Sequence, residues 1–131
     1  MNFKAHYPLL ILSLVVVITG WSCTQEGRCE DTLVVENPIE DITMSVGETL
    51  FIDLTNPPVF VSSEGRVIYD ISYLSVEGAV RIIFANNPND NGHLSMIKLT
   101  ALDKGEDFFQ LSASHGCLEN QLNFKVTAIK P

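Results

Sequence analysis

Positive charge is scarce in this 131-residue chain. Eight lysines and arginines stand against 16 aspartates and glutamates, which gives a formal net charge of −8. Nucleic-acid phosphates are bound chiefly by Lys and Arg, so this balance argues against DNA or RNA as a partner. Charged residues of both signs make up only 18% of the chain and apolar residues 46%. Such a composition excludes wholesale disorder and leaves room for one packed domain.

Sequence signatures of catalysis are also missing. The chain has no H-E-x-x-H, no G-x-S-x-G and no glycine-rich phosphate loop, the patterns of metalloproteases, serine hydrolases and nucleotide sites. His93 and His115 fall in predicted turns, and His115 lies close to Ser114 and Cys117 in the sequence. A nucleophile needs an oriented base, which such near neighbours seldom supply. We therefore expect no catalytic, cofactor-binding or metal-binding residues, and a protein that is not an enzyme.

The first 22 residues are predicted to be an export signal. Lys4 and the α-amino group form a positive start, Leu9–Ile18 is an apolar run, and Gly20-Trp21-Ser22 precedes Cys23. This is the order of regions in a secretory signal. An uncleaved transmembrane anchor is the alternative, although a spanning helix needs about 20 apolar residues and this run has half that length.

Residues 18–23 resemble the lipobox of bacterial lipoproteins. In that family the cysteine, here Cys23, receives a diacylglyceryl group and becomes the new N-terminus. Gly20 stands where the family usually has leucine, and Trp21 is bulky for its place. Ordinary signal cleavage that leaves Cys23 unmodified is therefore the alternative. Thr24 is not the Asp that the family associates with inner-membrane retention, so the resemblance implies an outer-membrane lipoprotein of the bacterial cell envelope, facing the periplasm or the cell surface.

The cysteine count favours lipidation. The three cysteines are Cys23, Cys29 and Cys117. Exported proteins fold in an oxidising compartment and usually pair their thiols. Lipidation of Cys23 leaves two cysteines that can pair, whereas an unmodified Cys23 leaves one over. We predict a disulfide between Cys29 and Cys117, worth roughly 4–5 kcal/mol in the chain-entropy model; two unrelated thiols are the alternative.

Beyond the signal and a lipidated tether over residues 23–30, residues 31–131 are predicted to form one domain built of strands. Apolar residues alternate with polar ones in short runs, and a period of two is the strand period. Glycine, asparagine and proline mark turns between the runs. We predict an all-β fold, a single antiparallel β-sandwich of seven or eight strands, with a small barrel or jelly roll as the alternative. The runs are 42–46, 50–54, 67–73, 80–84, 97–101, 109–113 and 122–128.

Three stretches of this domain resemble bacterial Ig-like and cadherin-like modules. Those modules open with an apolar strand, a V-G-E turn and a strand ending in I-D-L, as residues 42–54 do. Residues 97–114 are similar to their penultimate hairpin and residues 122–129 to their closing strand. The antibody pattern is absent, because the single tryptophan, Trp21, lies in the predicted signal. The resemblance implies an Ig-like sandwich with a structural or adhesive role.

The sequence thus predicts a non-catalytic, membrane-anchored lipoprotein that presents an Ig-like domain for protein contact or cell-envelope structure. The lipid at Cys23 binds the membrane, and the sequence does not identify the protein partner. A soluble secreted module that binds carbohydrate or protein is the alternative. Tyr69 and Tyr73 are expected to face inward, whereas Phe51 and Phe108 are candidate exposed aromatics. An outward pair of phenylalanines favours protein contact over a sugar site.

The loop at residues 86–92 is rich in oxygen atoms of the kind that calcium takes as ligands. It holds a single carboxylate, Asp90, so we expect a hairpin loop with left-handed Asn and Gly residues and no tight calcium site. Acidic pairs occur elsewhere and are expected to be solvated strand edges that oppose sheet-to-sheet aggregation. They are Glu30-Asp31, Glu40-Asp41 and Glu106-Asp107.

Overall fold

The computed structural model describes residues 31–63, 65–75 and 77–131. The predicted signal, Cys23 and Cys29 lie outside these residues. No helix in the described part of the chain is long and apolar enough to cross a membrane. In chain order the elements are β1 (Leu33–Val35), β2 (Ile42–Ser45), β3 (Thr49–Asp53), β4 (Phe60–Ser62), β5 (Ile68–Ser75), β6 (Val80–Asn87), the short 3-10 turn η1 (Pro88–Asp90), β7 (His93–Ala101), β8 (Gly105–His115) and β9 (Leu118–Ile129).

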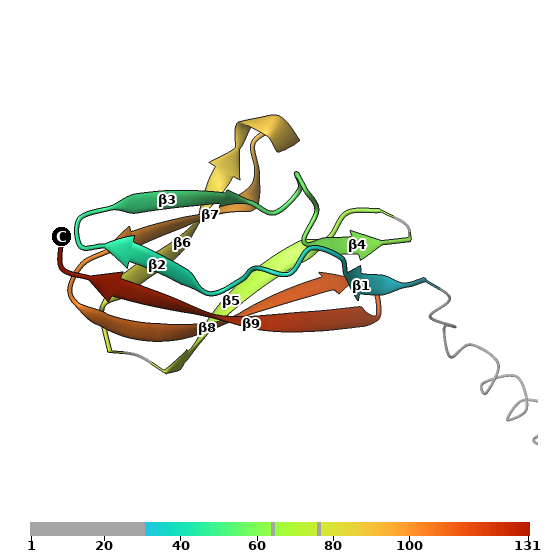
Figure 1. Cartoon of the computed structure of the whole chain (residues 1–131). Helices are drawn as coiled ribbons and strands as arrows, with labels where there is room; N and C mark the ends of the chain where they lie inside the picture. Colours follow the sequence, from blue (N-terminus) through green and yellow to red (C-terminus); the bar gives the residue numbers. More distant parts are fainter. Residues whose placement is uncertain (1–30, 64, 76) are drawn as a thin grey trace, which may run out of the picture.

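The strands form two packed sheets, and this confirms the predicted all-β sandwich (Figure 1). One sheet has the order β2-β9-β8-β5 and the other β3-β7-β6, while β1 and β4 pair as a separate ribbon. In immunoglobulin lettering, β3, β7 and β6 correspond to strands B, E and D of one sheet. β5, β8 and β9 correspond to strands C, F and G of the other, so the two sheets have the immunoglobulin arrangement. β2 joins β9 in parallel, and the other pairs are antiparallel. Each of the seven predicted runs corresponds to one of the strands β2, β3 and β5–β9.

The core lies between the two sheets and is built from alternate residues of the long strands. Phe109 of β8 is fully buried and packs at a tilt against Phe124 of β9, with ring centroids 5.5 Å apart. It also makes an edge-type contact with Tyr73, at 5.0 Å between centroids. Burial of such a side chain contributes about 1.5–3 kcal/mol. Tyr73 faces the core as predicted, yet 43% of it stays exposed, because β5 is an edge strand. Phe51 and Phe108 are exposed, as predicted.

The sandwich has two ends, which differ in what they carry. β1, the turn between β8 and β9, and η1 lie toward one end, which we call the leader pole (Figure 1). The C-terminus and the β2–β3 and β7–β8 turns lie at the opposite end, the distal pole. β9, with its 12 residues, spans about 40 Å. The chain therefore enters its fold at one pole and leaves it at the other.

The prediction of a solvated edge at residues 106–107 is wrong for Asp107. Its side chain is fully buried. One carboxylate oxygen accepts a hydrogen bond from the backbone N–H of Glu77 at 2.6 Å, and the other accepts one from Val80 at 2.9 Å. The carboxylate closes the link between β5 and β6 from inside the sandwich. Alternation along the sequence misses this role because both donors lie about thirty residues upstream.

Candidate functional site

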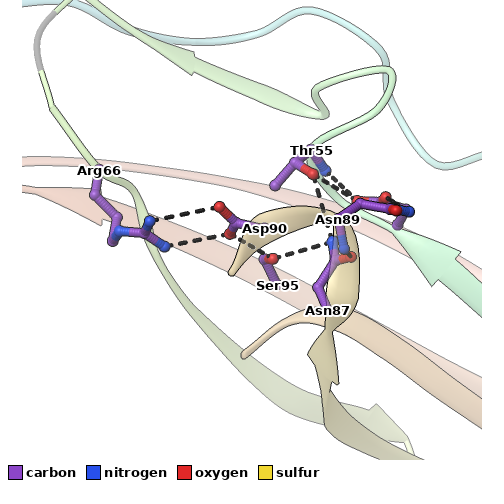
Figure 2. A network of polar contacts seen from close by, with 7 residues as sticks. Thr55, Arg66, Asn87, Asn89, Asp90 and Ser95 are labelled. Atoms are coloured by element: carbon purple, nitrogen blue, oxygen red, sulfur yellow. Dashed lines mark hydrogen bonds and ion pairs between the residues drawn. The ribbon is translucent and has the colours of Figure 1, made fainter. Parts of the chain in front are cut away.

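A network of polar side chains joins the ends of three strands at the leader pole (Figure 2). Asp53, the last residue of β3, accepts hydrogen bonds on Oδ1 from the backbone N–H of Thr55 at 2.9 Å and from its hydroxyl at 2.7 Å. The same oxygen accepts a bond from Nδ2 of Asn87 at 2.7 Å. Asp53 therefore ties the end of β3 to the end of β6.

Asn87 and Ser95 are the buried centre of the network, with 0% and 2% exposed. Nδ2 of Asn87 also lies 3.2 Å from Oγ of Ser95, and Oδ1 accepts a bond from the backbone N–H of Asn89 at 3.0 Å. Ser95 in turn donates to Asp90 at 2.7 Å, and Asp90 forms an ion pair with Arg66 at 3.2 Å. Figure 2 shows this continuous line from Asn87 to Arg66.

Local sequence explains why the chain turns here. Pro88 occupies the first turn of η1, where its missing N–H is not needed, and the side chain of Asn87 caps that turn. Asn91 and Gly92 have φ angles of 53° and 77°, the left-handed conformation predicted for this loop. Gly92 closes the hairpin with a backbone bond to Asn87 of 2.8 Å.

The network changes the acidity of three groups. Burial alone raises the pKa of Asp53, but hydrogen bonds from Thr55, Asn87 and Asn89 outweigh it and leave that pKa below its usual value. The pKa of Asp90 is also lowered, first by the hydroxyl of Ser95 and then by Arg66. Burial, followed by the negative charges of Asp90 and Asp53, raises the pKa of Tyr69. Both carboxylates are thus held in their charged form.

Two small hollows flank the ion pair between Arg66 and Asp90. The first measures about 180 Å³ and the second, which we call the Leu94 hollow, about 200 Å³. Both are smaller than the 300–1,000 Å³ typical of small-molecule pockets. The first is lined by Thr55, Pro58, Phe60, Arg66, Val67, Tyr69 and Asp90. The Leu94 hollow is lined by Arg66, Val67, Ile68, Tyr69, Phe84, His93, Leu94 and Ser95.

The hydrogen-bond donors around Asp53 and Asp90 affect whether these carboxylates could bind a metal ion. The described residues contain no group of three or more His, Cys, Asp or Glu side chains that could hold a metal ion. Asp53 receives amide and hydroxyl donors, and Asp90 receives Ser95 and Arg66. A calcium ion would have to displace these donors and overcome the charge of Arg66. The expectation that this loop has no tight calcium site remains a prediction.

His115 takes part in a second group of contacts, where the chain enters the domain. Its Nδ1 lies 3.0 Å from the carbonyl oxygen of Arg66, and its Nε2 lies 3.7 Å from a carboxylate oxygen of Asp31. A Cβ atom on Gly65 would lie 2.7 Å from the imidazole ring, so this position favours glycine. His115 and His93 are end residues of strands and do not lie in turns. His115 therefore connects the entering chain to the start of β5.

Further contacts secure the entering chain. The backbone of Thr32 bonds to the side chain of Ser63 at 2.8 Å, and Asn120 donates to the carbonyl of Leu33 at 3.1 Å. Cys117 lies in the turn between β8 and β9, two residues after His115. Cys29 precedes Asp31 by two residues but lies outside the described residues. The disulfide between Cys29 and Cys117 therefore stays a prediction.

Asp90 was identifiable from the sequence as the one carboxylate of the 86–92 loop, but the rest of the network was not. The missed members are Asp53, Thr55, Arg66 and Ser95, and Asn87, although it lies in the 86–92 loop, was not expected to be the centre of a network. One signal was present: Ser95 falls on the same alternation as the buried Ile97 and Leu99 of β7. A polar residue on an inward-facing position must find a buried partner. Which partner it finds depends on the pairing of distant strands.

The sequence and the structure were compared with known proteins, and the matches concern the fold alone. No family model and no curated protein matches the sequence. Among solved structures, the titin M3 domain matches with a TM-score of 0.45 and 9% identity, over 75% of this chain and 97% of that one. An endo-fucoidan hydrolase of glycoside hydrolase family 107 matches with a TM-score of 0.49 and 18% identity, over 79% of this chain and 14% of the hydrolase. Likenesses at this level carry no functional argument.

Proposed function

We propose that this protein is a non-catalytic lipoprotein of the bacterial outer membrane, anchored through Cys23, which presents its Ig-like domain for protein contact or envelope structure. The contacts of the entering chain support the geometry: Asp31 with His115, and Leu33 with Asn120. These contacts hold residues 31–33, which follow the predicted tether, at the leader pole. They support the orientation in the proposal, and the sequence of residues 1–23 supports the anchor.

The tether is short. From Cys23 to Asp31 the chain extends at most about 28 Å. A disulfide between Cys29 and Cys117 would shorten the flexible part to the stretch from Cys23 to Cys29, with a mean span of about 12–15 Å. The leader pole would then face the membrane, and the distal pole would stand about 40 Å further away, at the far end of β9.

The polar groups at the leader pole have a structural role. Every buried side-chain nitrogen and oxygen in the described part of the chain has a hydrogen-bond partner. Asp53, Asn87, Asp90 and Ser95 bind one another and hold the ends of β3, β6 and β7 together.

Membrane fractionation tests the anchor. The full chain is expressed in a bacterial host, and its distribution between membrane and aqueous fractions is measured after Triton X-114 phase separation. We expect the wild type in the detergent phase. Cys23→Ser, which has no thiol to receive the lipid, should be released from the membrane into the aqueous phase. Thr24→Ser is the control, a conservative change next to the predicted lipidation site, and this variant should partition like the wild type. A wild-type protein that stays in the aqueous phase with residues 1–22 removed would contradict the anchor and support the soluble secreted alternative.

A further inference from the structure

The two sheets have four edge strands, and three of these edges are protected. β2 and β3 are short, with four and five residues. β6 is longer, but two of its edge N–H groups are occupied by side chains: Val80 donates to Asp107 at 2.9 Å, and Ile82 donates to the hydroxyl of Tyr73 at 3.4 Å. Short or capped edges resist pairing with another chain.

The fourth edge belongs to β5 and is open. β5 pairs with β8 on one side, and no strand of the described structure pairs with it on the other. An irregularity between Tyr73 and Ser75 ends the regular pairing, so the usable edge runs over residues 68–73. It contains neither lysine nor proline, the residues that commonly block such edges.

An apolar hollow lies beside this edge. The Leu94 hollow is bounded by Ile68 and Tyr69 of β5 on one side and by Phe84 and Leu94 of β6 and β7 on the other. Ile68 is 68% exposed and Leu94 59% exposed, the largest fractions among the exposed large apolar residues of the described structure. A strand added to β5 would direct alternate side chains toward this hollow, since successive side chains point to opposite faces.

Charge distinguishes between possible occupants. Arg66, at the start of this edge, is already paired with Asp90. Asp70 is the one charged residue on β5, and it is exposed and makes no ion pair within the described residues. The chain as a whole carries a net charge of −8, so two copies repel each other. A basic segment would instead be attracted, and it would neutralise Asp70.

We propose that the edge of β5 binds an extended segment of a partner protein by strand addition, with apolar side chains in the Leu94 hollow alternating with basic ones near Asp70. In this mode, backbone hydrogen bonds supply affinity and the pocket for alternate side chains supplies specificity. The proposal rests on the proposed role in protein contact and assigns that role to a surface. It does not depend on the lipid.

Selection from a peptide library tests the proposal. The protein, purified from whichever fraction of the host contains it, is panned against a phage-displayed library of random nonapeptides. We expect enriched sequences in which apolar residues alternate with Lys or Arg. The strongest is then synthesised, together with a copy N-methylated on alternate amides. That copy should bind at least about tenfold more weakly, because its backbone cannot complete the ladder.

Variants locate the binding. Ile68→Asp and Leu94→Asp should each weaken the selected peptide about tenfold or more, and Asp70→Lys should weaken it through like charge. Phe51→Asp is the matched control, since Phe51 is 54% exposed on the outer face of the other sheet. It should leave the affinity unchanged. Thermal unfolding of each variant verifies the fold, and either of the two apolar positions suffices for the conclusion.

Several results would overturn the proposal. These are no enrichment, enrichment of acidic peptides or of peptides with helical periodicity, equal binding of the N-methylated copy, or an equal loss in Phe51→Asp. A concentration-dependent dimer in sedimentation that Ile68→Asp abolishes would assign the edge to a second copy of this chain. None of these readouts involves the membrane, so failure here and failure of the anchor are distinguishable.

Discussion

Asp107 shows how a single charged residue can organise a fold from inside. Its carboxylate is removed from water and accepts two backbone N–H groups, those of Glu77 and Val80. Hydrogen bonds to a charged group contribute about 1.5–3 kcal/mol, and a donor left buried without a partner costs a further 1–3 kcal/mol. The residue therefore fixes the β5–β6 link at the cost of burying a charge.

Replacing Asp107 with alanine should lower the free energy of unfolding by about 3 kcal/mol or more, because two backbone donors lose their acceptor. Asp107→Asn retains one acceptor oxygen and should lose less. Glu119→Ala, an exposed acidic residue of β9, should change stability by less than about 0.5 kcal/mol. Urea unfolding of the three variants provides the comparison. Equal stability of Asp107→Ala and wild type would refute this role.

The acid dependence of stability follows from Asp53 and Asp90. Both carboxyl groups have a lowered pKa in the folded protein. The unfolded chain therefore binds more protons below about pH 4, and stability should be present above that pH and be lost as the pH falls through the folded pKa values. The melting temperature of Asp53→Asn should drop less between pH 6 and pH 3 than that of the wild type. Parallel curves for the two proteins would contradict the assignment to Asp53.

At the scale of the element, alternation identified the strands but not the connections among them. Residues 42–46 and 122–128 were each predictable as strands, because apolar residues recur at every second position. Their parallel pairing, and the β1–β4 ribbon, depend on contacts between distant parts of the chain. The left-handed Asn91-Gly92 pair was predictable from local chemistry alone. The bonds of Asn87 to Asp53 and Ser95 were not, because three separate strand ends meet there.

The hairpin of β6, η1 and β7 should not need calcium. Arg66 forms an ion pair with Asp90, and Ser95 donates a hydrogen bond to it. The loop has one carboxylate, which supplies too little charge for a tight calcium site. Titration with calcium up to about 1 mM should leave the thermal midpoint nearly unchanged. Asn87→Ala should lower that midpoint, because it removes the centre of the network. A rise of many degrees with calcium that Asp90→Ala abolishes would show that the loop is a metal site.

On the scale of the whole molecule, the entry of the chain into the sandwich determines where a tether would attach. Asp31 lies beside His115, and Leu33 beside Asn120. Cys29 precedes Asp31 by two residues, and Cys117 follows His115 by two. Two residues of chain span at most about 7 Å, so each cysteine lies within that distance of one residue of the Asp31–His115 contact. Both cysteines can therefore reach the same part of the leader pole, where a disulfide requires their Cα atoms to come within about 7 Å of each other.

Peptide mapping without reduction tests the disulfide. Trypsin should release the peptide of residues 29–66 linked to the peptide of residues 105–125, because no lysine or arginine lies inside either one. Reduction should separate the two. Loss of the link should lower stability by roughly 4–5 kcal/mol in the chain-entropy model, less any strain in the bond. Two free thiols in the exported protein would exclude the disulfide and remove the support that the cysteine count gives to lipidation.

The mass of the N-terminal tryptic peptide tests the central claim, a domain held to the membrane by a lipid on Cys23. Cleavage after Arg28 yields a peptide of residues 23–28 when the signal has been removed. A lipid-anchored protein should give this peptide with the added mass of a diacylglyceryl group on Cys23, and no unmodified form should occur in the membrane fraction. An unmodified Cys23 at the N-terminus, or a peptide that still contains residues of the signal, would contradict the lipid anchor.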